Sequence, residues 1–302
     1  MELRIRNVSK TYAKSVHALK DVTLTIPRGM FGLLGRNGAG KSTLMRILAT
    51  LQQPDEGSVH LGDIDVIREK EKVRQTLGYL PQSFGFHPRV SAERLLEHFA
   101  VLKGIVEPGV RRDAVESLLR RTNLWEVRRQ RVGTFSGGMR QRLGVAVALL
   151  GNPKLIVVDE PTAGLDPEER VRFLNLLSEI GEASAVILST HIVADVEELC
   201  NRLAIIDRGE ILLEAEPARA IEQLRSRIWR RTVSRHELPA LERELPVIST
   251  KLLAGRTIAH VYAEASPGAG FEPVEPDMKD VYFSVMAGHH GRRRRADAEM
   301  AS

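Results

Sequence analysis

The chain contains 302 residues, of which 43% are hydrophobic and 27% are charged. These proportions are ordinary for folded proteins and exclude collagen-like, low-complexity and wholly disordered chains. The 44 basic and 39 acidic residues leave a net charge of +5, which is compatible with nucleic acid, an anionic membrane surface or a phosphate ligand as a partner.

From the sequence we expect neither a membrane span nor a secretory signal. The longest nearly unbroken apolar run, from Leu143 to Gly151, has nine residues, whereas a spanning helix needs about 20. The start, Met1-Glu2-Leu3-Arg4, has no apolar core behind a basic leader. Cys200 is the only cysteine. We expect a reducing cytosolic compartment and a buried packing role for Cys200 at a helix end.

The first 80 residues are predicted to form mostly strands. Apolar residues alternate with polar ones near both ends of residues 3–26, and Met30 to Leu34 is an apolar run that ends in Gly35. A helix is expected over residues 41–50, a hairpin over 59–64 and a strand over 77–80.

From about residue 83 to 150 the apolar residues recur at helical spacing. Strands then return at residues 155–158, 185–188 and 203–206, with helices expected at 167–180 and 192–199. Strands that alternate with helices indicate a parallel sheet covered on both faces. We therefore expect an α/β domain over residues 1–215, interrupted by a helical insertion at about 83–150.

The rest of the chain is predicted to form a small α+β extension over residues 216–287. Its elements are a basic helix over 217–230, strands at 247–253 and 258–263, a loop over 264–277 and an amphipathic piece over 278–287. Residues 288–302 are polar and basic, and they are expected to be disordered.

Residues 35–42, Gly-Arg-Asn-Gly-Ala-Gly-Lys-Ser, fit the phosphate-loop pattern Gly-x4-Gly-Lys-Ser/Thr. The glycines let backbone N–H groups point at a phosphate, and the helix that follows adds its positive end. Lys41 is expected to reach the β- and γ-phosphates, and Ser42 to bind Mg²⁺. The predicted nucleotide-binding residues of this segment are Gly35, Asn37, Gly38, Gly40, Lys41, Ser42 and Thr43.

Two further patterns support nucleotide chemistry. The apolar run Leu155 to Val158 ends in Asp159, which can hold Mg²⁺, and Glu160, which can polarise the water that attacks the γ-phosphate. Ser136-Gly137-Gly138 precedes a predicted helix and forms a second candidate anion site.

Together, in this order and spacing, these motifs resemble the ATPase subunit of an ATP-binding cassette (ABC) transporter. The resemblance covers about residues 2–215 and implies a P-loop NTPase core with a mainly parallel sheet, an N-terminal antiparallel β subdomain and an inserted helical subdomain. It also implies four more site residues: Tyr12 against adenine, Gln82 as sensor of Mg²⁺ and attacking water, Asp166 in the loop that faces the opposite subunit, and His191 at the γ-phosphate.

Each of these four residues also has a purely structural alternative. Tyr12 could be a strand-edge aromatic and Gln82 an exposed turn residue, while Asp166 and His191 could simply cap helices. Residues 135–139, Phe-Ser-Gly-Gly-Met, correspond to the family's signature motif, which is commonly Leu-Ser-Gly-Gly-Gln. Met139 stands in place of the glutamine and cannot form its amide hydrogen bonds.

The resemblance implies that two such subunits face each other head to tail around two ATP molecules, so a second copy or a paralogue is needed. Met278-Lys279-Asp280-Val281-Tyr282-Phe283 and residues 90–100 resemble the bacterial ABC-2 exporter group. This implies a separate multi-span permease and a position on the cytoplasmic face of the plasma membrane. No specific nucleic-acid partner is expected.

Two other classes stay open at this point. A soluble ABC ATPase acting on nucleic acid or ribosomes would explain the basic charge, but a second cassette and long coiled coils are both missing from the sequence. A P-loop kinase or GTPase would leave the Ser-Gly-Gly signature and His191 unexplained.

We also expect Phe84 and Phe86 to form a docking groove for the permease, with simple packing of the insertion as the alternative.

Overall fold

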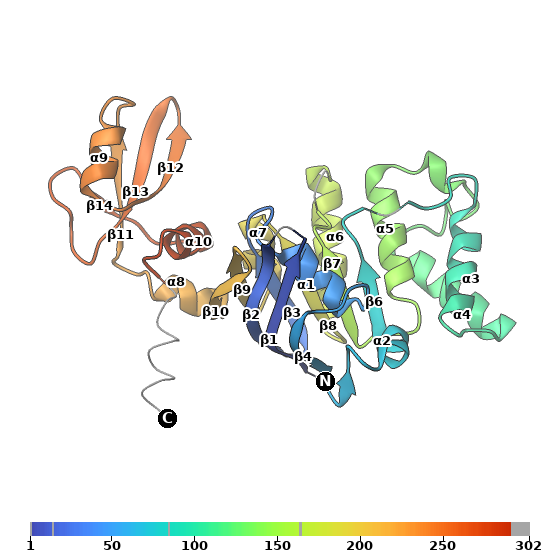
Figure 1. Cartoon of the computed structure of the whole chain (residues 1–302). Helices are drawn as coiled ribbons and strands as arrows, with labels where there is room; N and C mark the ends of the chain where they lie inside the picture. Colours follow the sequence, from blue (N-terminus) through green and yellow to red (C-terminus); the bar gives the residue numbers. More distant parts are fainter. Residues whose placement is uncertain (1, 14, 84, 163–164, 291–302) are drawn as a thin grey trace.

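The computed structural model describes residues 2–13, 15–83, 85–162 and 165–290. Its centre is a six-stranded sheet in the order β10-β9-β3-β8-β7-β6 (Figure 1). Five of these strands are parallel, and β10 runs antiparallel to β9. The bounds are β3 Gly29–Leu34, β6 Leu77–Leu80, β7 Leu155–Asp159, β8 Ala185–Thr190, β9 Arg202–Asp207 and β10 Glu210–Ala215.

Both faces of this sheet are covered, which explains why β7 and β8 are apolar and buried along most of their length. On one face, Val157 and Ile187 pack with α1 (Lys41–Leu48) and the N-terminal strands. On the other face, Ile156 and Val186 pack with the helices α5 (Gly137–Ala148), α6 (Pro167–Gly181) and α7 (Val193–Leu199). The predicted α/β core is therefore confirmed.

A second, antiparallel sheet has the order β2-β1-β4-β5. Its strands are β1 Leu3–Tyr12, β2 Val16–Ile26, β4 Glu56–Leu61 and β5 Ile64–Asp65. The alternation of apolar and polar residues in β1 and β2 places Leu3, Ile5, Leu24 and Ile26 in the core. This is the N-terminal antiparallel subdomain that the sequence predicts. A short helix, α2 (Lys70–Thr76), leads from it into β6.

The helical insertion contains α3 (Ala92–Leu102), α4 (Pro108–Arg121), the 3₁₀ turn η1 (Val132–Thr134) and α5. Ser91 and Glu107 cap α3 and α4 with their side chains, and Pro108 occupies the first turn of α4, where its missing N–H has no cost. The helices enclose a separate apolar cluster that includes Leu96, Leu119 and Leu143. Figure 1 shows the insertion projecting from the β6 edge of the sheet.

The C-terminal segment forms α8 (Pro217–Glu222), β11 (Ile228–Val233), α9 (Leu238–Glu244), β12 (Val247–Leu253), β13 (Arg256–Tyr262), β14 (Glu272–Pro273) and α10 (Met278–Met286). The predicted helix over residues 217–230 is wrong beyond Glu222. Residues 228–233 instead pair with β13, because Ile228, Trp229 and Thr232 favour a half-buried strand.

The last helix returns to the central domain. A capping box of Asp277 and Asp280 starts α10, which packs against α7 and α8, and Val281 and Val285 join the apolar cluster on that face of the sheet. The predicted disordered tail lies outside the described residues from 291 onward. Within the described part of the chain, none of the helices has the length and apolar character that crossing a bilayer requires.

Candidate functional site: a phosphate loop beside a buried glutamate

The loop between β3 and α1 has a backbone that demands glycine at two positions. Gly40 has a φ of 109°, and a Cβ there would lie 2.4 Å from the carbonyl oxygen of Ala18. A Cβ on Gly35 would lie 2.4 Å from the carbonyl oxygen of Ile206. Any larger residue would therefore push the loop away from the sheet. The loop leaves β3 and opens directly into the N-terminus of α1, the geometry that binds phosphate.

Lys41 is the first residue of α1, and its side chain is only 4% exposed. Its ammonium group donates to the carbonyl oxygens of Gly35 at 2.8 Å and Arg36 at 3.1 Å. The same nitrogen lies 3.3 Å from a carboxylate oxygen of Glu160. The lysine is thus held under the phosphate loop and paired with the glutamate that the sequence assigns to hydrolysis.

Three predicted residues converge on the carboxylate of Glu160. In addition to Lys41, the amide nitrogen of Gln82 donates to it at 3.3 Å, and Nδ1 of His191 lies 3.2 Å away. The sheet order explains this, because Gln82, Glu160 and His191 follow β6, β7 and β8, which are adjacent parallel strands. The glutamate is about 8% exposed and His191 44%, so the histidine reaches it from the solvent side.

Asp159 ends β7 beside Glu160 and is 3% exposed. Its Oδ1 atom is buried and has no hydrogen-bond partner among the described residues. Such an orphaned carboxylate oxygen fits a cation ligand. Burial and the negative charge of Asp159 both raise the pKa of the neighbouring Tyr79 phenol, which keeps that hydroxyl protonated.

Across residues 2–290, leaving out positions 14, 84, 163 and 164, no group of three or more His, Cys, Asp or Glu side chains could hold a metal alone. One carboxylate and one hydroxyl, Asp159 and Ser42, would need the phosphates of a nucleotide to complete a coordination sphere. Magnesium is typically bound in this way, through few protein ligands and the substrate.

Tyr12, the predicted adenine contact, ends β1 at the turn into β2 and is 39% exposed. Its hydroxyl donates to the side chain of Gln52 at 2.8 Å and lies 3.4 Å from the hydroxyl of Thr43. Thr43 is in the first turn of α1. The aromatic ring is therefore tethered to the helix that follows the phosphate loop.

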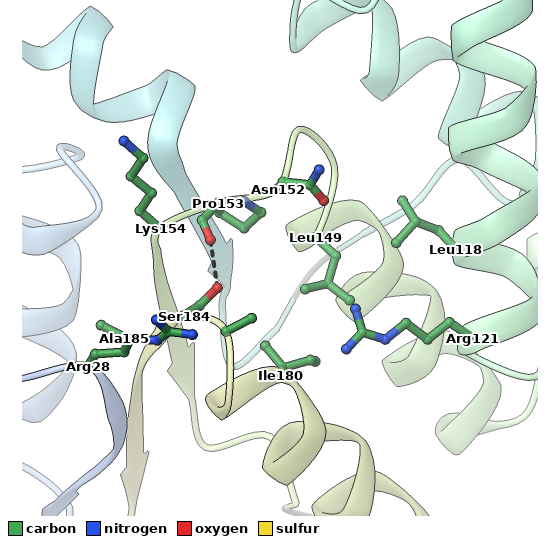
Figure 2. A pocket seen from close by; sticks show the side chains of 11 residues that line it. Arg28, Leu118, Arg121, Leu149, Asn152, Pro153, Lys154, Ile180, Ser184 and Ala185 are labelled. Carbon is green, nitrogen blue, oxygen red and sulfur yellow. Dashed lines mark hydrogen bonds between the residues drawn. The ribbon is translucent and has the colours of Figure 1, made fainter. Parts of the chain in front are cut away.

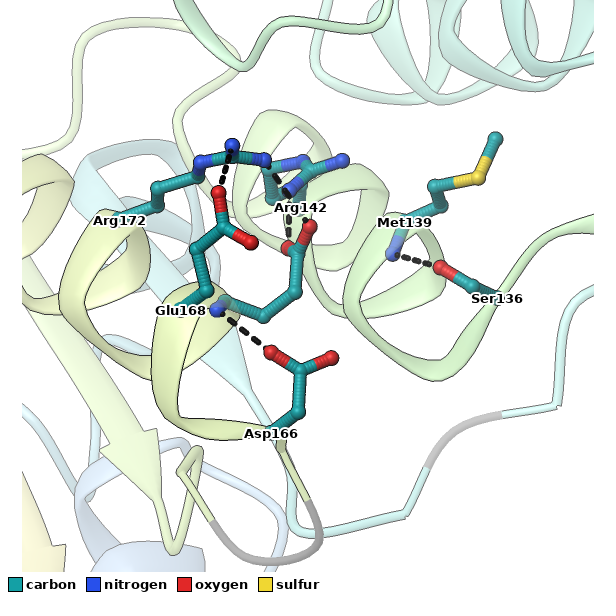
Figure 3. Close-up of polar contacts among 7 residues, drawn as sticks. Ser136, Met139, Arg142, Asp166, Glu168 and Arg172 are labelled. Carbon is teal, nitrogen blue, oxygen red and sulfur yellow. Dashed lines mark hydrogen bonds and ion pairs between the residues drawn. The ribbon is translucent and has the colours of Figure 1, made fainter.

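The predicted signature residues lie on the helical insertion, not beside the phosphate loop (Figure 1). Ser136 caps α5 by accepting a hydrogen bond from the backbone of Met139 at 3.1 Å (Figure 3). The side chain of Met139 packs against the apolar cluster of the insertion. Gly137 and Gly138 form the first turn of α5. The second candidate anion site is therefore the start of a different helix from the one that follows the phosphate loop.

Asp166 caps α6 by accepting from the backbone of Glu169 at 2.9 Å (Figure 3). Glu169 also pairs with Arg142 of α5, so an ion pair joins the signature helix to α6. A Cβ on Gly138 would lie 2.5 Å from the Glu169 carboxylate, so a larger residue there would displace that side chain. Residues 163 and 164 of the predicted Ala163-Gly164-Leu165-Asp166 motif lie outside the described residues.

Sequence reasoning missed a buried carboxylate next to this site. Asp195 on α7 is fully buried and contacts Thr162, Thr190 and Arg170. Its signal in the sequence is weak, because an acidic residue in a short helix normally points to solvent.

The predicted docking groove for the permease rested on Phe84 and Phe86. Phe86 packs edge-on against Phe99, with 6.3 Å between the ring centres, inside the insertion, which favours the packing alternative. Phe84 lies outside the described residues.

A surface pocket of about 290 Å³ lies at the opposite end of the sheet's strands, where β7 and β8 begin (Figure 2). Lys154 and Ser184, which line it, precede β7 and β8, whereas the phosphate loop follows the end of β3. Arg28 there donates to the carbonyl oxygen of Glu182, just past the C-terminus of α6. Arg28 therefore neutralises a carbonyl at a helix end and Arg121 pairs with the carboxylate of Glu179, so the pocket is not the nucleotide site.

Residues 19–163 match the family model described as ABC transporter. The Linearmycin resistance ATP-binding protein LnrL of Bacillus subtilis is 34% identical over 212 residues, which cover 70% of this chain and 68% of that protein. The uncharacterized ABC transporter ATP-binding protein YxlF of Bacillus subtilis is 33% identical over 300 residues, 94% of this chain and 99% of that protein.

Among solved structures, one similar protein is the ATP-binding cassette MJ0796, in a dimeric post-hydrolysis state bound to ADP and Pi. Its sequence is 28% identical and its TM-score is 0.65, and the match covers 71% of this chain and 98% of the MJ0796 chain. The chain therefore belongs to the ABC transporter family, as an ATP-binding subunit. It binds ATP and is an ATPase that powers transport.

Proposed function

We propose that this chain works as one of a pair of Mg²⁺-dependent ATPase subunits that drive export through a separate ABC-2-type permease at the cytoplasmic face of the plasma membrane. The observation that carries the proposal is the convergence of Lys41, Gln82 and His191 on the buried carboxylate of Glu160. A carboxylate in this position can orient and polarise water at the end of the phosphate loop.

We assign the site residues the roles that the family resemblance implies, and their geometry supports this assignment. Lys41 and the backbone N–H groups of the phosphate loop hold the phosphates, and Glu160 acts on the attacking water, with Gln82 and His191 orienting it and the γ-phosphate. Tyr12 stacks on the base. Ser42 and the orphaned oxygen of Asp159 would hold Mg²⁺, which supplies positive charge against the phosphates.

The second half of each nucleotide site comes from another subunit. Ser136, Gly137 and Gly138 start α5 of the insertion, whereas the phosphate loop precedes α1, and on this proposal the signature completes the site of the facing subunit in a head-to-tail pair. Asp166 lies at the start of α6, and α6 is ion-paired to the signature helix α5. In the proposed pair, Asp166 contacts the facing subunit. The dimeric state of the related MJ0796 cassette supports this arrangement.

Export is supported by one relative, LnrL, whose name records resistance to linearmycin. The similarity to YxlF over 300 residues supports the view that the C-terminal extension, residues 216–287, is shared with other ABC ATP-binding proteins. Binding of nucleic acid is less favoured, since Arg120 and Arg128 of the basic insertion stack on Trp125, at 4.3 and 3.7 Å from its ring centre.

The test is co-expression of the tagged chain with the protein encoded beside it. We expect that neighbour to be a multi-span membrane protein, to co-purify with the chain in detergent, and to form a complex whose ATP hydrolysis stops when EDTA removes Mg²⁺. A neighbouring nuclease or ribosomal factor that co-purifies instead, or hydrolysis that is stimulated by nucleic acid, would contradict the proposal.

A further inference from the structure

The carboxylate of Asp195 is fully buried, yet it is not one of the groups that the proposed reaction uses. One of its oxygens accepts hydrogen bonds from the hydroxyls of Thr162 at 2.6 Å and Thr190 at 3.3 Å. The other oxygen accepts two from the guanidinium of Arg170, at 2.9 and 2.5 Å. A buried charge is tolerated only with such partners, so all four contacts hold the aspartate in one place.

Each partner stands next to a residue of the nucleotide site. Thr162 is two residues beyond Glu160, and Thr190 immediately precedes His191. Arg170 lies one turn into α6, where its backbone N–H donates to the carbonyl oxygen of Asp166 at 2.9 Å. One carboxylate thus ties together the segments that follow β7 and β8 and the start of α6.

These segments need an external anchor. Glu160 has a φ of 48°, in the left-handed region that is costly for a residue with a side chain. His191 is held from both sides, since the Thr190 hydroxyl binds Asp195 and also accepts from the backbone N–H of Ile192 at 2.9 Å. The 3.2 Å contact between His191 and Glu160 depends on both segments keeping their positions.

We propose that Asp195 is a positioning residue for ATP hydrolysis, which sets the mutual geometry of Glu160 and His191 by fixing Thr162 and Thr190. The inference rests on the proposed roles of those two residues. It predicts an effect on the chemical step and not on ATP binding, because the phosphate loop and Lys41 have no described contact with Asp195.

The test is Asp195→Asn in the full chain. The variant keeps the shape of the side chain but replaces one acceptor oxygen by an N–H donor, which faces either the threonine hydroxyls or the arginine. We expect kcat to fall by about 10- to 100-fold, the scale of a displacement of about 1 Å at a reacting centre. We expect KM and the affinity for a fluorescent ATP analogue to stay within about threefold, the precision we allow for unchanged binding.

A matched control is Glu214→Gln, which breaks the ion pair of Glu214 with Arg202 between β9 and β10, at 2.8 Å. It costs folding stability without touching the two segments, so its kcat should stay at the wild-type value. If Asp195→Asn also keeps the wild-type kcat while losing only thermal stability, Asp195 has a structural role alone and the inference is wrong.

Two milder variants keep the test decisive if Asp195→Asn does not fold. Thr162→Val and Thr190→Val remove single hydroxyls at nearly constant volume, and each is expected to lower kcat with KM unchanged. Wild-type kcat in both would overturn the inference. The proposed function fails separately, by normal ATP hydrolysis in Glu160→Gln or by the co-purification outcomes that contradict it.

Discussion

The ammonium group of Lys41 lies 3.3 Å from the carboxylate of Glu160, and the two side chains are only 4% and 8% exposed. The proposed phosphate-binding cation and the carboxylate proposed to act on water are therefore partners of each other in the described structure. On this proposal, phosphates in the loop would compete with Glu160 for Lys41, so ATP would change the partners of this carboxylate before hydrolysis.

Replacing this lysine should affect both binding and stability. In Lys41→Ala, the affinity for ATP should fall steeply because the phosphates lose their buried cation. The nucleotide-free protein should also lose about 1–3 kcal/mol, less than the full cost of orphaning a buried charge because Gln82 and His191 still contact Glu160. Titration with a fluorescent ATP analogue and thermal unfolding measure the two effects.

The control is Lys20→Ala, which removes an exposed lysine paired with Glu210 at 3.2 Å. Exposed pairs contribute little, so neither ATP affinity nor stability should change measurably. Equal losses of ATP affinity in the two lysine variants would mean that Lys41 has no special role.

The composite site can be tested by mixing two inactive variants. Lys41→Ala disables the phosphate loop, and Ser136→Ala disables the signature. In a mixed head-to-tail pair both defects fall in one site, and the other site is intact. If the second subunit is another copy of this chain, partial ATP hydrolysis should return on mixing. No recovery over the sum of the separate activities would contradict such a homodimer.

The C-terminal extension contains a buried pair whose stability depends on pH. Nδ1 of His260 on β13 lies 2.8 Å from the carboxylate of Asp280 on α10. Burial raises the pKa of Asp280, but the hydrogen bonds from His260 and the Asp277 backbone, with the charge of His260, lower it by more. The ionised Asp280 therefore stabilises the fold fully above the ordinary aspartate pKa of about 3.9. This stabilisation is lost as the pH falls through the lower pKa that Asp280 has in the folded protein.

We therefore expect thermal unfolding of the full chain to show an acid-sensitive step below about pH 4. Asp280→Asn should be less stable at neutral pH and should lose less stability between pH 5 and pH 2. An identical acid dependence in wild type and variant would show that the pair is not the group that titrates.

Cys200 should be chemically inert while the protein is folded. Burial, and to a smaller extent the nearby negative charge of Asp195, raise the pKa of the Cys200 thiol to about 12. Because the thiolate is the reactive form, iodoacetamide at pH 8 should leave the native protein unmodified and should label it fully in urea. Rapid labelling of the native chain would show that α7 opens readily.

Local motifs predicted the central sheet, and glycine spacing and strand-end acids marked the phosphate loop and Glu160, whose roles stay predictions. The strand register then brought Gln82 and His191 to the same carboxylate, which spacing alone could not show. The helix expected over residues 217–230 was wrong, since its last residues pair with a distant strand. Asp195 escaped notice because burial of a lone acid depends on partners from three separate segments.

The most direct measurement of the central claim is steady-state ATP hydrolysis by Glu160→Gln, beside Glu71→Gln as an exposed control on α2. Glutamine keeps the shape of the side chain but cannot act as a base, so turnover should fall by about 10² or more. ATP binding should persist, and an ATP-bound dimer should accumulate on size-exclusion chromatography. Wild-type turnover in Glu160→Gln would contradict the assignment of this carboxylate and the account built on it.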